Sequence, residues 1–365
     1  MNWLEQLQKW RRQLHREPEL SFQETKTTNY IIEQLQDLTG VQLLYGVDQI
    51  GLNTGVVAIV GNGSSPVVGL RADIDALPIT EQTGLSFRSK HDGIMHACGH
   101  DGHTAMLIGA VRQLSELSQS GKLTGTVKCL FQPAEEMEDT KGKTGAQYVL
   151  ESGVLADLEA IIAIHLDPEI PLKSVKLKSG LVMANVDTFK INISGSGGHG
   201  AYPEQAVDPI WLSSLTLPYL YSIPSRRIKA EDPSVLSICQ ITGGSQANVI
   251  PSEVTISGTI RTYSDQARNQ IVYEIEKGLR SVGELGGSFD FFIHHGEPAL
   301  LNDPVLTGEL RSLLENLNEE INIFEETYGM GGEDFSHITR QIPGVMIFLG
   351  AKEKETSLHQ PTFNI

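Results

Sequence analysis

Two kinds of apolar segment alternate along the first half of the chain, and this alternation constrains the fold most strongly. Helical periodicity occurs at residues 3–14, 24–38 and 104–117, whereas residues 126–131 and 160–166 are short apolar runs of strand length. Such strands are apolar on both faces, so helices must cover both sides of the sheet that they form. The sequence therefore predicts an α/β domain built around a central sheet.

Two local features of this first part lead to more specific expectations. Asn2 is predicted to cap the first helix, with Glu5 three residues later, and Leu4 falls on the apolar face. The sequence Gly-Asn-Gly-Ser-Ser at residues 61–65 is typical of a hairpin turn. We therefore expect the strands that flank this turn, at residues 55–60 and 66–74, to be neighbours.

The pattern of elements changes at about residue 185 and returns to the first style after Pro298. Between these points the order is β-α-β-β-α-β, with strands at 186–193, 235–241, 254–262 and 289–294 and helices at 209–221 and 265–282. This order is typical of a ferredoxin-like unit, a small four-stranded sheet with two helices. We expect residues 184–297 to form a domain inserted into a larger one made of residues 1–183 and 298–365.

Composition and charge argue against several classes of partner. The chain has 28 Lys and Arg against 45 Asp and Glu, a net charge of −17, and so lacks the positive charge that nucleic-acid binding requires. No run approaches the ~18 apolar residues of a membrane span, and the N-terminus does not resemble a secretion signal. Three cysteines are too few, and odd in number, for a disulfide framework, which indicates a reduced, cytoplasmic protein.

Potential metal ligands gather in residues 95–103, whose sequence is Met-His-Ala-Cys-Gly-His-Asp-Gly-His. Cys98 and His100 are one residue apart, and Gly99 between them leaves the backbone free to aim both side chains. A thiolate and an imidazole suit Zn²⁺ and neighbouring transition metals. A single Cys-x-His alone would be better explained as a buried cysteine beside surface histidines.

A pair of carboxylates follows another strand. Glu135 and Glu136 come after the apolar run that Pro133 interrupts. One such acid can bind a metal while the other acts as a general base toward water. By itself an adjacent pair of glutamates is weak evidence, because it usually marks a solvated turn.

Two further polar residues follow predicted strands. His165 ends the apolar run at 160–164, and Asp73 follows the run at 67–72. A lone histidine after a buried strand is more often a core residue than a ligand. Open α/β sheets, however, gather ligands and catalytic groups at the carboxyl ends of their strands. The combination predicts a functional site at this edge of the sheet.

Eight segments spread over nearly the whole chain resemble one family. They are residues 15–20 (HREPEL), 70–78 (LRADIDALP), 98–101 (CGHD), 132–136 (QPAEE), 198–203 (GHGAYP), 247–251 (ANVIP), 332–335 (GEDF) and 358–361 (LHQP). The chain resembles the aminoacylase/carboxypeptidase-type metallopeptidases, in the subgroup of hippurate hydrolases, auxin-conjugate hydrolases, bacterial N-acyl-amino acid amidohydrolases and N-acetyl-diaminopimelate deacetylases. The resemblance implies a mixed-sheet, zinc-peptidase-like catalytic domain with an inserted lid or dimerisation domain.

The resemblance also implies a role for individual residues. Two divalent metal ions (Zn, Mn, Co or Ni) would be held by five ligands, with Cys98 bridging them: Cys98, His100, Glu136, His165 and His359. Glu135 would be the general base, and His199 would reach the active site of the partner subunit. Asn248 would bind the carboxylate of the substrate. Relatives with a histidine in place of Arg71 use it as a ligand, a role that here passes to His100.

The expected function is hydrolysis of the amide bond of an N-acyl amino acid or a similar small conjugate, by a water that two metals activate. A dipeptidase or aminopeptidase using the same site is the nearest alternative, and a non-catalytic, metal-stabilised binding protein is a more remote one. A homodimer, or an oligomer built from dimers, is the expected assembly. The chain ends at Ile365, soon after His359, where members of the subgroup normally continue into a closing helix.

The remaining candidates receive structural interpretations. Asp73 and His103 are expected to orient a ligand, Cys129 and Cys239 to be core residues. The other histidines are expected on the surface or in packing roles: His91, His96, His294, His295 and His337.

Overall fold

The protein folds into two compact units. The computed structural model describes residues 2–317, 320–353 and 355–365. Unit 1 consists of Met1–Gly180, Leu301–Tyr328 and Asp334–Ile365, and unit 2 of Leu181–Leu300 and Gly329–Glu333. None of the described helices is both long and apolar enough to cross a membrane.

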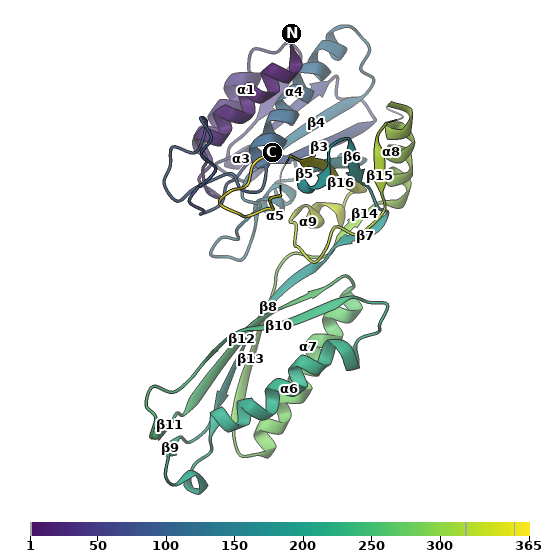
Figure 1. The fold of residues 1–365 in the computed structure, drawn as a ribbon. Helices are drawn as coiled ribbons and strands as arrows, with labels where there is room; N and C mark the ends of the chain where they lie inside the picture. Colours follow the sequence, from purple (N-terminus) through teal and green to yellow (C-terminus); the bar gives the residue numbers. More distant parts are fainter. Residues whose placement is uncertain (1, 318–319, 354) are drawn as a thin grey trace. The chain divides into compact units, whose positions relative to one another are not determined.

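Unit 1 is built around a mixed eight-stranded sheet (Figure 1). From one edge to the other its strands are β1 (Val41–Leu44), β2 (Val56–Gly61), β4 (Thr126–Gln132), β3 (Val67–Asp73), β5 (Ala160–Pro171), β16 (Gly344–Lys352), β6 (Ser174–Lys176) and β15 (Asn322–Phe324). The four central strands β4, β3, β5 and β16 are parallel to one another, so their carboxyl ends meet at the same edge. The predicted α/β fold with a central sheet is confirmed.

The hairpin predicted between the first two long strands is wrong. Although β2 and β3 are joined by the turn at residues 61–65, strand β4 lies between them, antiparallel to β2 and parallel to β3. The turn residues allow a tight reversal, but they do not determine which strands pair. A strand from a later part of the chain forms both sets of hydrogen bonds instead.

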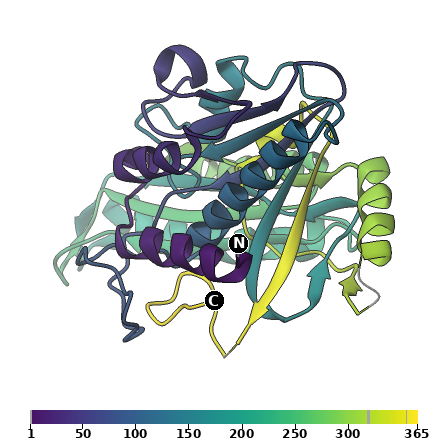
Figure 2. The same cartoon turned by 90° about the horizontal axis from the view of Figure 1, so that it is seen from above.

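Helices cover both faces of this sheet. On one face lie α1 (Trp3–Arg16), α2 (Thr25–Leu35) and α4 (His100–Gln119) (Figure 2). Their buried side chains form one apolar core with β2, β3 and β4. Helix α8 (Pro304–Leu317) packs on the same face, because Leu70 of the first core is in register with Ile162 of the α8 core. On the other face, Gly344 leaves room for Thr339 of α9 (Phe335–Thr339). Two more helices complete the unit: α3 (Val47–Ile50) and α5 (Gly145–Glu151).

Three side chains differ from the sequence-based expectations. Asn2 occupies the N-cap position of α1, but its side chain makes no capping hydrogen bond. Leu4 is 66% exposed, because it lies at the margin of the apolar face of α1, on which Trp10 and Leu14 are buried. Cys239 is exposed rather than in a core, since it sits at a bulge in β10 where the strand register shifts.

Unit 2 is a four-stranded antiparallel sheet with two helices on one of its faces (Figure 1). The strands, in spatial order, are β10 (Ser234–Thr242), β12 (Glu253–Thr262), β8 (Asn185–Ser194) and β13 (Ser288–His295). Helices α6 (Pro209–Arg227) and α7 (Asp265–Glu284) bury their apolar sides against the sheet. A smaller pair in this unit is β9 (Gly198–His199) with β11 (Val249–Ile250), and a short 3-10 helix covers Pro203–Gln205. Strands β7 (Gly180–Met183) and β14 (Leu300–Asn302) also pair, and each contains a point where the chain passes from one unit to the other.

The core of unit 1 leads to a first prediction. Leu35 of α2 is fully buried, whereas Leu4 of α1 is 66% exposed. We expect Leu35→Ala to lower the free energy of unfolding by about 2–5 kcal/mol, because it leaves a cavity in a close-packed core. Leu4→Ala removes the same atoms from a mostly hydrated position and should cost less than about 1 kcal/mol. Urea denaturation followed by circular dichroism measures both, and equal losses would contradict the assignment of this core.

Candidate metal centre

The carboxyl ends of the neighbouring strands β3 and β4 and the start of one helix carry several of the predicted site residues. Asp73 is the last residue of β3, and Glu135 and Glu136 lie in the loop that follows β4. His100 is the first residue of α4, and Cys98 lies directly before it, with Gly99 in the left-handed conformation between them (φ 92°). The segment was predicted to become helical only at residue 104. The helix starts earlier, so His100 projects from its first turn.

His165 does not end its strand as expected. Strand β5 continues to Pro171 because β16 pairs with it through this region. Its pairing with β3, however, reaches only Ala163, so His165 lies just past the end of this pairing, level with Asp73. The side chain is therefore free to face the same edge as Asp73.

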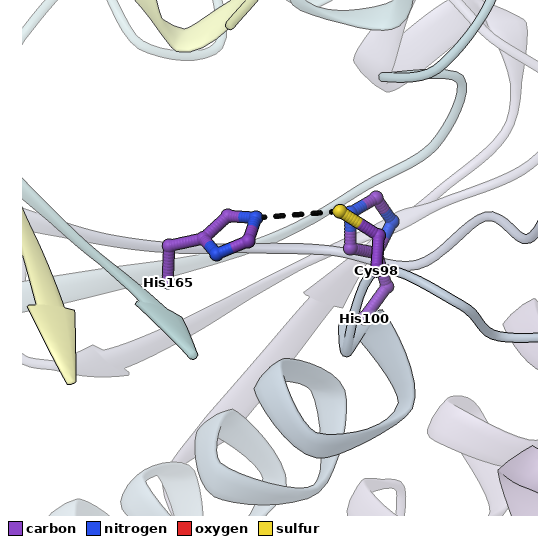
Figure 3. Close-up of side chains that lie close together, drawn as sticks. All are labelled: Cys98, His100 and His165. Carbon is purple, nitrogen blue, oxygen red and sulfur yellow. Dashed lines mark hydrogen bonds between the residues drawn. The ribbon is translucent and has the colours of Figure 1, made fainter. Parts of the chain in front are cut away.

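The five expected ligands and Glu135 lie in one cluster within unit 1. Ligand atoms lie within 4.8 Å of one another in three overlapping groups: Cys98 with His100 and His165; Cys98 with Glu136 and His359; His100 with Glu135 and Glu136. Cys98 belongs to the two groups that contain His165 and His359. Figure 3 shows its Sγ atom between the rings of His100 and His165, 3.5 Å from His165 Nε2.

Hydrogen bonds set the tautomers of three buried histidines, His100, His103 and His165. His165 Nδ1 donates to the Leu166 carbonyl (2.8 Å) and His100 Nδ1 donates to the Asp75 carbonyl (3.0 Å), which turns both Nε2 atoms into the cluster. His103 is different, because its Nε2 accepts from the Leu166 N–H (2.8 Å) and its Nδ1 lies 2.5 Å from Asp73 Oδ1. Both nitrogens of His103 are thus occupied within the protein, which fits a residue that orients Asp73.

Two buried atoms of the cluster have no hydrogen-bond partner among the described residues, namely His100 Nε2 and Glu136 Oε1. Such atoms are costly unless a ligand pairs with them. Together with a thiol, two further imidazoles and a second carboxylate, they make a donor set suited to divalent transition metals. The residues present therefore fit a centre for two metal ions.

The charges of the cluster favour a cation in the same place. Burial opposes the charged form of His100, but the carboxylates of Asp73, Asp75 and Glu136 outweigh it and raise the pKa of His100 to about 10. Burial, with the charges of Asp75 and Asp73, raises the pKa of Glu136 to about 7. Negative charge is thus in excess at this edge, and a bound cation would stabilise it.

Arg71 takes part in a buried network instead of facing the cluster. Its guanidinium donates to Asp73 Oδ2 (2.8 Å), Asp334 Oδ1 (2.9 Å) and Gln132 Oε1 (3.0 Å). Gln132 Nε2 in turn donates to both carboxylate oxygens of Asp334. This network fixes Asp73 and therefore His103. Asp334 lay in a recognised segment, but no sequence signal assigned it a role.

Two further buried acids hold the cluster, and sequence reasoning gave neither a role. Asp75 approaches His100 Nδ1 with Oδ1 (3.2 Å) and accepts from the Glu136 N–H with Oδ2 (3.0 Å). Glu24 accepts from the Ala134 N–H (2.8 Å). Asp75 belongs to the recognised segment 70–78 and could have been suspected from it, whereas Glu24 appeared only as the start of a predicted helix.

His359 lies in a C-terminal segment that several contacts anchor. Its Nε2 is 3.5 Å from Glu136 Oε1, and its N–H donates to the Ala97 carbonyl (2.8 Å). Phe363 is fully buried beside Met95 and Ala97. Arg11 donates to Asn364 Oδ1 and to the Ile365 carbonyl, each at 3.1 Å.

His199 and Asn248 belong to unit 2, whereas the residues above belong to unit 1. They meet where β9 pairs with β11, and the Gly200 N–H donates to the Asn248 carbonyl (2.9 Å). His199 Nδ1 accepts from the Ala201 N–H (3.0 Å), so its proton is carried on Nε2. Both side chains are exposed.

The histidines expected to have structural roles lie outside the cluster. His96 is buried, which lowers its pKa to about 4 and keeps it neutral. His91 pairs with Glu17 and His295 with Asp187. His294 is exposed and His337 is partly buried in α9.

Known proteins share both the sequence and the fold. N-acetyl-L-cysteine deacetylase of Bacillus subtilis (strain 168) is 40% identical over 359 residues, covering 97% of this chain and 82% of the relative. N-acetyldiaminopimelate deacetylase of Priestia megaterium is 35% identical over 355 residues, covering 96% and 91%. A solved structure from Bacillus subtilis, described as a dinuclear metal binding peptidase of the M20 family, matches with a TM-score of 0.85 at 34% identity and covers 100% of this chain and 93% of its own. The model of peptidase family M20/M25/M40 matches residues 69–365, and the chain therefore belongs to this family.

Proposed function

We propose that the protein is a metal-dependent amidohydrolase that cleaves the amide bond of an N-acyl amino acid or a related small conjugate. The observation that carries this proposal is the cluster of Cys98, His100 and Glu136 with Glu135 beside it. A closed structural metal site has no use for an additional acid at its rim, whereas a hydrolytic site needs one. The names of the two deacetylase relatives agree with this chemistry.

The proposed ligands of two divalent ions are Cys98, His100, Glu136, His165 and His359, with Cys98 between the two sites. Cys98 is the residue shared by the group that contains His165 and the group that contains His359, which supports this bridging position. Zn, Mn, Co and Ni all accept this mixture of sulfur, nitrogen and oxygen. Ions bound there supply a Lewis acid for the amide carbonyl and an activated water.

Glu135 is the proposed general base. It takes a proton from the attacking water and passes it to the departing amine. Its side chain is partly exposed and lies beside His100 and Glu136, and the Asp334 N–H approaches its Oε1 at 3.4 Å. The side chain of Glu136 is only 9% exposed and lies between His100 and His359, which suits a ligand better than a proton shuttle.

Unit 2 is proposed to be a ferredoxin-like lid and dimerisation domain. Its strand order and two helices support the fold, and an uncharged, partly exposed face of α6 supports a homodimer, or a dimer-based oligomer. This face carries Ile210, Trp211, Leu215 and Tyr221, each 49–56% exposed. His199 of the partner subunit would donate from Nε2 to the oxyanion, and Asn248 would bind the substrate carboxylate. Three free cysteines, without a disulfide among them, fit the reducing cytoplasm.

The two glutamates should respond differently to the same change. Glu135→Gln keeps the shape of the side chain but cannot accept a proton, so kcat should fall by at least ~10²-fold while bound metal stays constant. Glu136→Gln, its matched control, should lose metal because it removes a charged ligand. Metal analysis alongside kinetics separates the two. Near-normal turnover of Glu135→Gln at full metal occupancy would show that another residue is the general base. Loss of metal from Glu135→Gln would show that Glu135 is the ligand and Glu136 the base.

The thiol of Cys98 should be required for metal binding. We expect Cys98→Ala to lower metal content and activity together, because alanine offers no ligand atom. Cys129→Ala is the control, since this thiol is also buried but lies in the sheet core. Metal content after dialysis against each ion provides the measurement. Full metal retention by Cys98→Ala would show that Cys98 is not a metal ligand.

A substrate panel tests the reaction itself. N-acetyl and N-benzoyl amino acids and N-acetyl-diaminopimelate should be hydrolysed, each with Zn, Mn, Co or Ni added. Dipeptides with a free amino group are the comparison. Preference for these dipeptides would replace the proposed function with that of a dipeptidase or aminopeptidase.

A further inference from the structure

A buried acid far from the proposed ligands in sequence holds the loop that carries Glu135. Glu24 lies at the N-terminus of α2 and is completely buried. Its Oε1 accepts from the Ala134 N–H (2.8 Å), and its Oε2 accepts from the Thr54 hydroxyl (2.9 Å). The side chain of Glu24 therefore hydrogen-bonds to the backbone N–H of the residue that precedes Glu135.

Ala134, the residue that Glu24 binds, has an unfavourable backbone conformation. Ala134 has a φ of 53°, in the left-handed region that costs a residue with a side chain about 1–2 kcal/mol. Contacts from outside the loop hold it there. The Gly145 N–H donates to the Ala134 carbonyl (2.8 Å), and any side chain on Gly145 would collide with the Pro133 carbonyl. Glu24 supplies the matching contact on the N–H side of Ala134.

The other end of the loop has a different anchor. The Glu136 N–H donates to Asp75 Oδ2 (3.0 Å), and the same aspartate contacts His100 Nδ1. Asp75 is thus tied to two of the proposed ligands, whereas Glu24 touches neither. The two buried acids act on opposite sides of the Glu135 backbone.

We propose that Glu24 is a positioning residue that aims Glu135 by fixing the N–H group and the left-handed backbone of Ala134. This inference rests on the proposed function, in which Glu135 is the general base. The contact needs an acceptor of the right length and does not need a negative charge. Burial, and then the charge of Asp75, raise the pKa of Glu24 to about 8, so a neutral side chain is also compatible with the site.

Three substitutions of Glu24 distinguish the effect of its side-chain length from the effect of its charge. In Glu24→Gln the carbonyl oxygen can still accept from Ala134, and the amide can donate to the Thr54 hydroxyl, so we expect kcat within about threefold of the unchanged enzyme. Glu24→Asp keeps the charge but is shorter by one methylene group, and Glu24→Ala removes the acceptor. In both, kcat should fall by about 10- to 100-fold, as misplacement of a catalytic group by about 1 Å does. KM and bound metal should change by less than about twofold, because no proposed ligand is touched.

Thr54→Val is the matched control for stability. It removes the second hydrogen bond of Glu24 and leaves the contact with Ala134 in place. We expect its melting temperature to fall while kcat is retained. Hydrogen–deuterium exchange of a peptide covering residues 132–137 gives a readout that does not depend on activity. Exchange there should accelerate in Glu24→Asp and Glu24→Ala but not in Glu24→Gln or Thr54→Val.

Several results would overturn the inference. Unchanged kcat and exchange in Glu24→Asp would show that the contact does not position the loop. An equal loss of kcat in Glu24→Gln would make charge the decisive property. If Glu24→Ala does not fold, Glu24→Asp and Glu24→Gln still provide the comparison. Failure of the proposed function appears separately, as full activity of Glu135→Gln, while the exchange experiment still reports on the loop.

Discussion

Buried negative charge is the constraint on which the rest of unit 1 depends. Four carboxylates beneath one edge of the sheet are almost completely removed from water: Asp73, Asp75, Asp101 and Asp334. An unpaired buried charge costs several kcal/mol, so each must find partners in other parts of the chain. Arg71 pairs with two of these acids, and Asp101 binds both Arg11 and His15 at 2.8 Å. The arrangement of the strands and of the first helix follows from these requirements as much as from apolar packing.

The same charges connect the separate parts of the proposed centre. Arg11 pairs with Asp101, which is adjacent to His100 in the first turn of α4, and also binds the segment that follows His359. Asp75 connects His100 with the backbone of Glu136. Two of the proposed ligands, His100 and Glu136, are therefore held by a carboxylate that is itself buried and paired. Such pre-organisation keeps ligands and catalytic groups in place before a substrate arrives.

The sequence predicted the elements of the fold and the members of the cluster well, but not the connections between them. The spacing of apolar residues and the length of each apolar run are local properties of the sequence. They located the central strands and α4 to within a few residues. The pairing of β4 between β2 and β3 is not local, since it depends on competition among strands far apart in the chain. The role of Glu24 was also hidden, because a glutamate at the start of a helix is ordinarily exposed. Only the fold places Ala134 against it.

What the sequence by itself determined was the chemistry available: a cysteine, several histidines and two adjacent glutamates, most of them predicted to lie near a strand end or a helix start. The recognised segments identified the family, because residue types at fixed spacings can be compared between sequences without knowing which residues contact one another. What only the tertiary structure decided was which atoms face one another. The backbone carbonyls of Leu166 and Asp75 select the tautomers of His165 and His100, and burial leaves His100 Nε2 and Glu136 Oε1 directed at the same place. These choices depend on hydrogen-bond direction and exclusion of water, which exist only once distant segments have packed together.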